Sequence, residues 1–274
     1  MKISVAQFAP TDDKSQNIET LRMLAARASA ENSRVLVAPE ASLFHPKQPS
    51  TQEVIDAAEP LDGPFVTALA EISAEHGLLI AAGSFRPATG DTDGGKVYNT
   101  QVILDRGTLR AAYDKLHLYD AFTYRESDYI VPGDDLPPVL EVDGFRIGFS
   151  TCYDLRFPEM FRHFADQSVD VLANGAAWVR GILKEEHWMT LLRARAIENT
   201  AYVFGSGDAG PRSVGRSAIY DPLGVQLADA GEMSPTIITA DVTRSRIDDV
   251  RKTVPSLQHR RSLFAQAVPA GSPA

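Results

Sequence analysis

The chain is poor in cysteine, since Cys152 is the only one among its 274 residues. A single cysteine cannot form an intramolecular disulfide, and without Cys or His partners at ligand spacing it cannot anchor a zinc site. The six histidines form no H-E-x-x-H motif and no close pair, so we expect no metal. The thiol of Cys152 is therefore either a small buried hydrophobe, as most free cysteines are, or a nucleophile.

Long apolar runs and basic runs are also missing. No stretch of 18 apolar residues occurs, which predicts no membrane-spanning helix and no membrane partner. The first eight residues, MKISVAQF, alternate like a short strand and lack the apolar region and cleavage site of a signal peptide. We therefore expect a cytoplasmic protein whose thiol stays reduced. With 27 basic against 36 acidic residues, a net charge of -9 and no basic run, we expect a small-molecule partner and no nucleic acid.

Short apolar segments alternate with helix-period segments along most of the chain. Hydrophobic residues make up 44% of it, enough to bury a large core. Strands interleaved with helices indicate an α/β layered fold, and a hairpin around Asp105-Arg-Gly107 indicates a mixed sheet. The predicted strands are 3–8, 35–38, 78–83, 98–104, 108–113, 146–150, 169–173, 201–205 and 236–240, and the predicted helices are 17–30, 64–76, 158–165 and 185–199.

One motif imitates a cofactor site. Residues 205–210, GSGDAG, match the G-x-G-x-x-G pattern after a predicted strand. However, Pro211, Val214 and Gly215 follow where a dinucleotide-binding fold needs a helix. We therefore expect no NAD and, with no metal site predicted, no cofactor.

Cys152 stands at the end of an apolar run, 145–151, that has the length and composition of a strand. The polar segment that begins at Tyr153 can turn into a helix over 153–165. A thiol at such a strand-to-turn junction is well presented for chemistry, in the manner of a nucleophile elbow.

Two charged residues stand at similar junctions, because Glu40 follows strand 35–38 and Lys115 follows the second strand of the hairpin. Taken alone, such a glutamate is more often a helix cap or surface residue, and such a lysine is solvated. Together with Cys152 they form the minimum set for amide hydrolysis through a thioester. The set needs a nucleophile, a carboxylate that moves protons and a cation that stabilises the oxyanion, but no histidine.

Three segments resemble, in order and spacing, the signatures of the nitrilase superfamily of carbon-nitrogen hydrolases. They are Pro39-Glu40, Tyr113-Asp-Lys-Leu-His-Leu118 and Cys152-Tyr-Asp-Leu-Arg-Phe-Pro-Glu159. The resemblance continues through His187-Trp188 and the segments 192–199 and 254–261, so it covers nearly the whole chain. Within the superfamily, the chain is most similar to the amidase branch that contains deaminated-glutathione amidase and omega-amidase.

The resemblance implies a role for each residue of the set. Glu40 is implied as general base, Lys115 as oxyanion donor and Cys152 as nucleophile, and the backbone N–H of Tyr153 completes the oxyanion hole. Glu126 takes the place of a second glutamate that orients the lysine and the substrate. An isolated glutamate in a loop is otherwise a surface residue.

The resemblance also implies a four-layer α-β-β-α sandwich with two mixed sheets. Residues 1–262 would form the carbon-nitrogen hydrolase domain, and residues 263–274 a flexible tail. The implied assembly is at least a homodimer, in which the subunits pair sheet against helix across a two-fold axis.

The segment 176–181, AAWVRG, departs from the small Ser/Thr-rich lining of glutathione-type relatives. Ala176, Ala177, Trp178 and Arg180 are our candidate substrate-binding residues, with Tyr153. Because an indole shortens a cavity and a guanidinium can grip a carboxylate, we expect a short carboxylate-bearing amide such as 2-oxoglutaramate, with Arg180 as the clamp. Trp178 can equally belong to the core, and Arg180 can face solvent.

Other readings remain open at this point. A deaminated-glutathione amidase, a true nitrilase, a carbamoylase or an N-acyltransferase would share the same three residues. A cysteine-histidine hydrolase would place an imidazole, instead of a carboxylate, nearest the sulfur. A non-catalytic binding module would be expected to have lost at least one of Glu40, Lys115 and Cys152, and all three are present.

Overall fold

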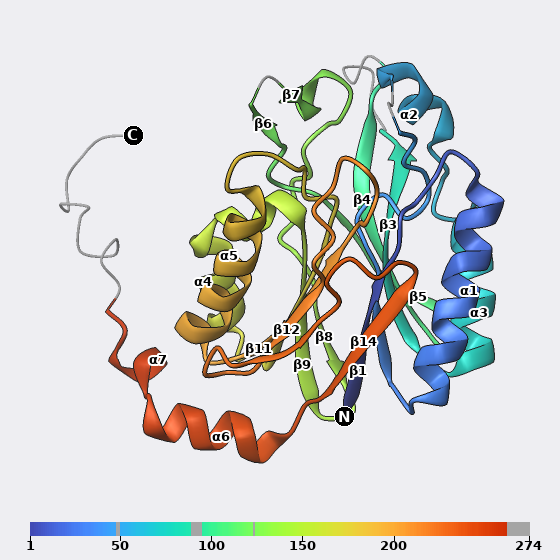
Figure 1. Cartoon of the computed structure of the whole chain (residues 1–274). Helices are drawn as coiled ribbons and strands as arrows, with labels where there is room; N and C mark the ends of the chain where they lie inside the picture. Colours follow the sequence, from blue (N-terminus) through green and yellow to red (C-terminus); the bar gives the residue numbers. More distant parts are fainter. Residues whose placement is uncertain (48–49, 89–94, 123, 262–274) are drawn as a thin grey trace.

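The protein is built around two six-stranded mixed sheets that pack face to face (Figure 1). It is described from a computed structural model that covers residues 1–47, 50–88, 95–122 and 124–261. The expected tail 263–274 lies outside these residues. In strand order, the first sheet is β14 (Thr236–Asp241), β1 (Lys2–Gln7), β2 (Val35–Val37), β3 (Leu79–Pro87), β4 (Val97–Asp105) and β5 (Thr108–Asp114).

The second sheet repeats this plan. Its order is β13 (Gln226–Asp229), β12 (Ala218–Tyr220), β11 (Tyr202–Gly207), β10 (Val171–Ala176), β9 (Phe145–Thr151) and β8 (Val139–Val142). In each sheet three neighbouring strands are parallel, β1, β2 and β3 in one and β9, β10 and β11 in the other, and the outer strands are antiparallel.

Helices cover the outer face of each sheet (Figure 1). Helices α1 (Lys14–Ala30) and α3 (Pro64–His76) lie on the first sheet, with α2 (Thr51–Ala57) beside β3, and α4 (Pro158–Asp166) and α5 (Lys184–Asn199) lie on the second. The helix ends follow local rules. The Asp13 side chain caps α1 by accepting from the Gln16 amide, and α3 starts at Pro64 and ends at Gly77 in the left-handed conformation.

Three apolar clusters separate the layers. One lies between the first sheet and its helices, one between the two sheets and one between the second sheet and its helices. A strand of the inner layers must therefore be apolar on both faces, which explains the continuous apolar runs in the sequence. The predicted four-layer α-β-β-α sandwich is confirmed.

The structure corrects one predicted element. The segment 153–165 is not a single helix, since a 3-10 turn over Cys152–Arg156 comes first and α4 begins at Pro158. Proline disfavours helical backbone in the residue before it, and Phe157 is accordingly extended, with φ -104° and ψ 94°. The break keeps the thiol-bearing turn separate from the helix.

The remaining elements are short or peripheral. The strands β6 (Asp120–Ala121) and β7 (Tyr124–Arg125) form a small hairpin, and a 3-10 turn covers Glu126–Asp128. Helices α6 (Arg244–Thr253) and α7 (Ser256–His259) lie at the bottom left of Figure 1, beyond the sandwich. No helix among the described residues is both long and apolar enough to cross a membrane.

Candidate active site

Cys152 lies on a tight elbow directly after β9. Its φ of 44° is left-handed, a conformation rare for residues other than glycine and common at functional sites. The buried carboxylate of Asp154 clamps the elbow, because it accepts hydrogen bonds from the Thr151 amide (3.0 Å), the Tyr113 hydroxyl (2.8 Å) and the His117 ring (2.8 Å). The predicted strand-to-turn elbow at Cys152 is thus present, and it is tied to the end of β5.

Glu40 is brought to the thiol by close packing of the two sheets. A Cβ added to Gly175 in β10 would lie 2.6 Å from the carbonyl oxygen of Ala38, and one added to Gly83 in β3 would lie 2.4 Å from the amide of Ala41. Only glycine allows these approaches. The segment after β2 is thereby pressed between its own sheet and the opposite one, with the Glu40 side chain 6% exposed.

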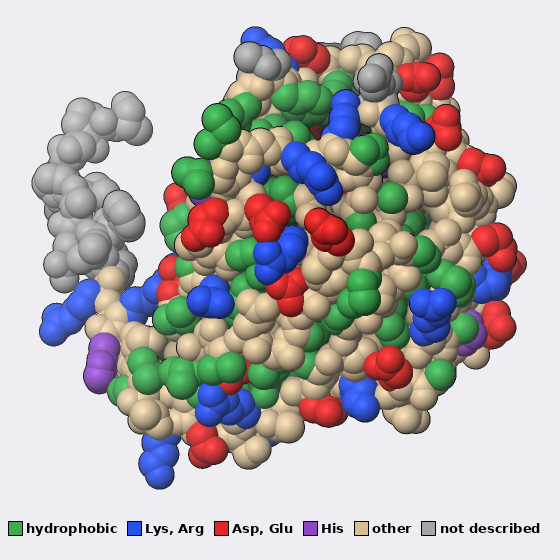
Figure 2. Space-filling view, viewed as in Figure 1, with side chains coloured by type: hydrophobic (Ala, Val, Ile, Leu, Met, Phe, Trp, Pro, Cys, Tyr) green, Lys and Arg blue, Asp and Glu red, His purple; other side chains and the backbone are tan. Residues whose placement is uncertain are grey.

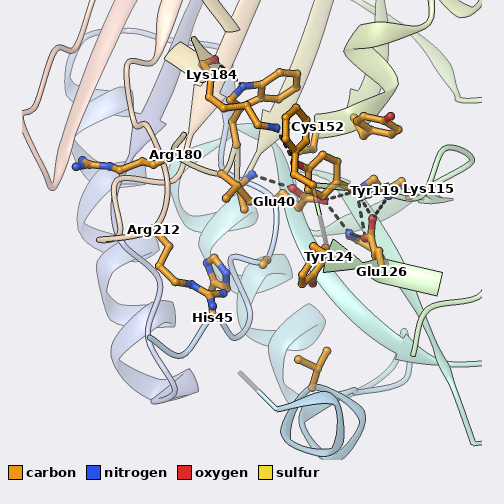
Figure 3. Close-up of a pocket in the computed structure, with 18 of the residues that line it drawn as sticks. Glu40, His45, Lys115, Tyr119, Tyr124, Glu126, Cys152, Arg180, Lys184 and Arg212 are labelled. Atoms are coloured by element: carbon orange, nitrogen blue, oxygen red, sulfur yellow. Dashed lines mark hydrogen bonds and ion pairs between the residues drawn. The ribbon is translucent and has the colours of Figure 1, made fainter. Parts of the chain in front are cut away.

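Every oxygen of Glu40 has a partner. Its Oε1 accepts from Lys115 Nζ (2.9 Å) and from Asn99 Nδ2 (2.8 Å), and its Oε2 accepts from the Ala177 amide (2.8 Å). These bonds fix the carboxylate in one orientation (Figure 3). Sequence reasoning missed Asn99, because nothing in the apolar pattern of its strand marks one asparagine as special.

Lys115 is a buried ammonium held by two carboxylates. It is 2% exposed and donates to Glu126 Oε2 (2.8 Å) as well as to Glu40. Burial opposes its charge, but Glu126 and Glu40 outweigh this effect and raise the pKa of Lys115 well above its ordinary value. Lys115 is therefore a fixed positive charge at neutral pH.

Glu126 lies beside Lys115, as the resemblance implied. It is 4% exposed and also accepts from Asn99 Nδ2 (2.9 Å) and from the Tyr119 amide (2.7 Å). Asn99 Nδ2 thus bridges Glu126 and Glu40, and both carboxylates hold the Lys115 ammonium. The surface reading of this glutamate is wrong.

The surroundings of Cys152 and Glu40 determine which of the two carries a proton. Burial tends to raise the pKa of Glu40, but the charge of Lys115 and the Ala177 amide outweigh it and hold that pKa below the ordinary value. Burial, followed by the charge of Glu40, raises the pKa of the Cys152 thiol well above its ordinary value. At rest the site thus holds a protonated thiol next to an ionised carboxylate, which is the arrangement that general-base catalysis needs.

No histidine takes this role in the described part of the chain. The main influences on the pKa of Cys152 after burial are Glu40, Lys115 and Glu126, none of them an imidazole. His117 is bonded to Asp154 and stacks on Phe157 at 3.7 Å between ring centres. These contacts tie the residue that follows Lys115 by two positions to the elbow. The geometry disfavours a cysteine-histidine hydrolase.

These residues open onto a pocket of about 420 Å³, within the range that buries small-molecule ligands. Glu40, Lys115, Glu126 and Cys152 all line it (Figure 3). Its remaining wall is largely aromatic and cationic, and sequence reasoning singled out few of these residues because they come from loops scattered along the chain. They include His45, Tyr119, Phe122, Tyr124, Tyr129, Lys184 and Arg212.

Only some of the predicted substrate-binding residues line this pocket. Tyr153, Ala177 and Trp178 line it, whereas Ala176 is fully buried inside β10 and is not part of the described wall. Trp178 is 3% exposed and also packs on Trp188 at 5.5 Å, so it belongs to both the core and the pocket. Arg180 is at the rim. Its Nε donates to the Ser213 carbonyl, and Figure 3 shows its guanidinium pointing away from Cys152.

Residues 2–252 match the family of carbon-nitrogen hydrolases. The chain belongs to this family. It is 40% identical over 261 residues to a deaminated glutathione amidase of Escherichia coli O157:H7, a match that covers 95% of the chain and 97% of the relative. This protein is therefore an enzyme that acts on carbon-nitrogen bonds, and the suspected amidase branch of the nitrilase superfamily is confirmed.

Solved structures agree with this assignment. The carbon-nitrogen hydrolase fold superposes on the C. elegans NitFhit protein with a TM-score of 0.86 and 30% identity, covering 95% of this chain and 65% of the other. A mutant amidase from Nesterenkonia sp. AN1 matches with a TM-score of 0.74 and 25% identity, over 95% and 94% of the two chains. That protein shows covalent addition of the acetamide moiety of fluoroacetamide at its active site cysteine.

Proposed function

We propose that this carbon-nitrogen hydrolase converts a small carboxylate-bearing amide, such as 2-oxoglutaramate, to the acid and ammonia through a thioester on Cys152. One observation carries the proposal. The Glu40 carboxylate is fixed by Lys115 and the Ala177 amide beside a buried, protonated Cys152 thiol at the wall of the pocket. These are the groups that amide cleavage through a thioester requires.

The first half of the reaction forms the thioester. Cys152 Sγ attacks the amide carbon while its proton passes to Glu40, and the negative charge that develops on the carbonyl oxygen is stabilised by Lys115 and the backbone N–H of Tyr153. Glu40 then returns the proton to the amide nitrogen, the C–N bond breaks and ammonia leaves. The C–S bond remains, so the acyl group is held on the enzyme.

The second half removes the acyl group. Glu40 takes a proton from a water molecule, whose oxygen attacks the thioester carbon, and the same oxyanion donors stabilise the second tetrahedral intermediate. The C–S bond breaks, the sulfur recovers its proton from Glu40 and the acid is released. Glu126 positions Lys115, with which it forms an ion pair at 2.8 Å.

The pocket's charge supports an anionic substrate. Four cationic side chains line it, Lys115, Arg180, Lys184 and Arg212, against two carboxylates, Glu40 and Glu126. The whole chain carries a net charge of -9, and Figure 2 shows acidic and basic side chains mixed over one face of the molecule, so the positive pocket is a local feature that opposes the overall charge. Such a pocket raises the local concentration of carboxylate-bearing amides over neutral ones.

Deaminated-glutathione hydrolysis is the second candidate. Relatives of this name are 40% identical in Escherichia coli O157:H7 and 37% identical in Synechocystis, the latter over 89% of the chain. The volume of the pocket admits both the short and the longer amide. We favour the short one because the Trp178 indole forms part of the wall.

The test is a panel of amides assayed for ammonia release with wild-type enzyme and Cys152→Ala. We expect 2-oxoglutaramate to have the highest kcat/KM, deaminated glutathione a lower one, and Cys152→Ala to show no release from any of them. A nitrile and a carbamoyl compound in the same panel test the other superfamily activities. Faster turnover of deaminated glutathione would make it the preferred substrate in place of 2-oxoglutaramate. Ammonia release by Cys152→Ala would overturn the mechanism.

A further inference from the structure

A second buried lysine lines the pocket, and its charge is not neutralised. Lys184 begins α5, is 4% exposed and takes part in no ion pair within the described ranges. Its Nζ donates one hydrogen bond, to the Tyr119 hydroxyl at 2.6 Å. A buried ammonium with a single neutral partner is costly, so this position calls for an explanation.

Three aromatic rings surround the ammonium. Lys184 Nζ lies 4.3 Å from the ring centre of Phe122, 4.6 Å from that of Tyr119 and 5.7 Å from that of Trp178. Trp178 Nε1 also donates to the Lys184 carbonyl at 2.8 Å, which fixes the backbone of the lysine. The rings partly compensate a cation, but they provide no anion. The arrangement is an aromatic cage around a charge, open toward the pocket.

Lys184 and Lys115 differ in their surroundings. Lys115 is flanked by two carboxylates, which raise its pKa, whereas burial and then the nearby charge of Arg156 lower the pKa of Lys184. Arg156 also lies over the Trp178 ring, with its guanidinium carbon 4.8 Å from the ring centre. The corner of the pocket around Trp178 is therefore short of negative charge until an anion enters.

We propose that Lys184 binds the carboxylate of the amide substrate. The inference rests on the proposed function, which places the amide of the substrate at Cys152. The inference adds where the carboxylate of the same substrate binds. In Figure 3 the Lys184 side chain runs toward Cys152, so a carboxylate on Nζ leaves the amide a few carbons away to reach the thiol. The Tyr119 hydroxyl accepts from Lys184 and keeps its own hydrogen, which it can donate to the same carboxylate.

Lys184 fits this task better than Arg180, the clamp expected from the sequence. Arg180 is exposed and bonded to the Ser213 carbonyl, and it points away from the thiol. A charge-assisted hydrogen bond is also stronger in a buried site than at a rim, where water competes. The carboxylate therefore goes to the desolvated cation.

The test measures binding of 2-oxoglutaramate to Cys152→Ala, in which no turnover occurs, by titration calorimetry. Adding Lys184→Met keeps the length of the side chain and removes its charge, and we expect Kd to rise about 10- to 150-fold, the equivalent of about 1.5–3 kcal/mol. Lys184→Arg should recover most of the affinity. Lys252→Met, an exposed lysine on α6, is the matched control and should leave Kd unchanged.

The neutral amide pentanamide separates carboxylate recognition from general damage to the pocket. We expect Lys184→Met to change its kcat/KM, measured in the active enzyme, by no more than about twofold. Two results overturn the inference while leaving the amidase function intact. One is a fall in kcat/KM for pentanamide as large as the loss of affinity for 2-oxoglutaramate, and the other is an unchanged Kd for 2-oxoglutaramate. Absence of any ammonia release by the wild type overturns the proposed function instead.

A titration of pH needs no lysine variant, and so also covers the case in which Lys184→Met does not fold. In Cys152→Ala the titratable and charged groups that face Lys184 are the Tyr119 hydroxyl, whose pKa is raised by burial, and the Arg156 guanidinium. As pH rises through the lowered pKa of Lys184, the ammonium is lost and the affinity for 2-oxoglutaramate should fall. An affinity that does not fall by pH 10.5, the ordinary pKa of a lysine, contradicts the inference.

Discussion

At the scale of single residues, the site depends on Glu40 being charged while Cys152 is not. The carboxylate is surrounded by Lys115, Asn99 and the Ala177 amide, and these donors stabilise its ionised form. Burial, and then the charge of the same carboxylate, keep the proton on the neighbouring thiol. In the proposed mechanism, Cys152 therefore loses its proton to Glu40 as the sulfur attacks the substrate carbon, and the thiol stays protonated before that step.

Replacing Glu40 by glutamine tests this division. The amide side chain keeps the shape but cannot accept a proton, so we expect turnover to fall about 10²–10⁴-fold. Hydrolysis of the thioester needs the base as well, so the acyl-enzyme that does form should persist. Intact-protein mass spectrometry after incubation with substrate should detect it on Glu40→Gln and not on Cys152→Ala. Wild-type turnover in Glu40→Gln would remove Glu40 from the mechanism.

At the scale of elements, the turn after β9 and the end of β5 act as one unit because Asp154 binds both. Its buried carboxylate accepts from Tyr113 on β5, from His117 just after it and from Thr151 at the end of β9. Lys115 lies between Tyr113 and His117, so the same contacts set the separation of the ammonium from the thiol. The lysine signature and the cysteine signature are thus joined by hydrogen bonds between the two elements that carry them.

Asp154→Ala should therefore damage both stability and chemistry. It leaves the Tyr113 hydroxyl and the Thr151 amide without their partner, and we expect a loss of about 2–4 kcal/mol in the free energy of unfolding, measured in urea. The kcat should fall at temperatures where the variant is still folded, because the elbow loses its clamp. Asp12→Ala, at an exposed site, is the control. A folded, fully active Asp154→Ala would show that the clamp is dispensable.

At the scale of the whole molecule, the site exists because two sheets meet. Glu40 follows β2 and Lys115 follows β5 in the first sheet, whereas Cys152 follows β9 and Ala177 follows β10 in the second. Gly175 allows the sheets to come together at this point, since its absent side chain leaves room for the Ala38 carbonyl. Catalysis therefore requires the correct spacing between two layers.

Gly175→Ala should separate those layers locally. The added methyl group would lie 2.6 Å from the Ala38 oxygen, so backbone must move, and Glu40 should lose its bond to the Ala177 amide. We expect a loss of about 1–3 kcal/mol in stability and a fall in kcat of at least about tenfold. Gly144→Ala, a left-handed glycine with open space around it, should lower stability without changing kcat. Unchanged kcat in Gly175→Ala would refute the spacing argument.

Assembly is the second prediction at this scale, and we propose a homodimer. Ile197 at the end of α5 and Leu223 and Val225 before β13 are each about half exposed, and they lie together because the 223–225 turn packs on Ile197. A helix and a strand edge of this kind fit the expected pairing of sheet against helix. Light scattering should give twice the mass of one chain, and Leu223→Glu with Val225→Glu should halve it. A monomeric wild type would contradict the dimer.

Much of this protein could be read from the order of its residues. The inner strands and the main helices follow from apolar runs and helical periods, because each inner strand is buried on both faces. The three residues of the site follow from their junctions and from the family's signatures, which are local segments. The sequence pattern does not predict β8, β12 and β13. Strands β8 and β13 lie at the edges of the sheet, bury less and carry a weaker pattern, whereas β12 is fully buried but only three residues long.

The substrate pocket did not follow from the sequence, because it is assembled from residues far apart in the chain. Asn99 bridges Glu40 and Glu126 only after β4 is paired in the sheet, and Lys184 becomes a caged cation only when Tyr119, Phe122 and Trp178 close around it. The charge of a residue does not indicate whether its side chain will be desolvated. The sequence therefore does not distinguish Arg180, which is exposed, from Lys184, which is buried. Desolvation is a property of packing, and packing determines which cation is available to the substrate.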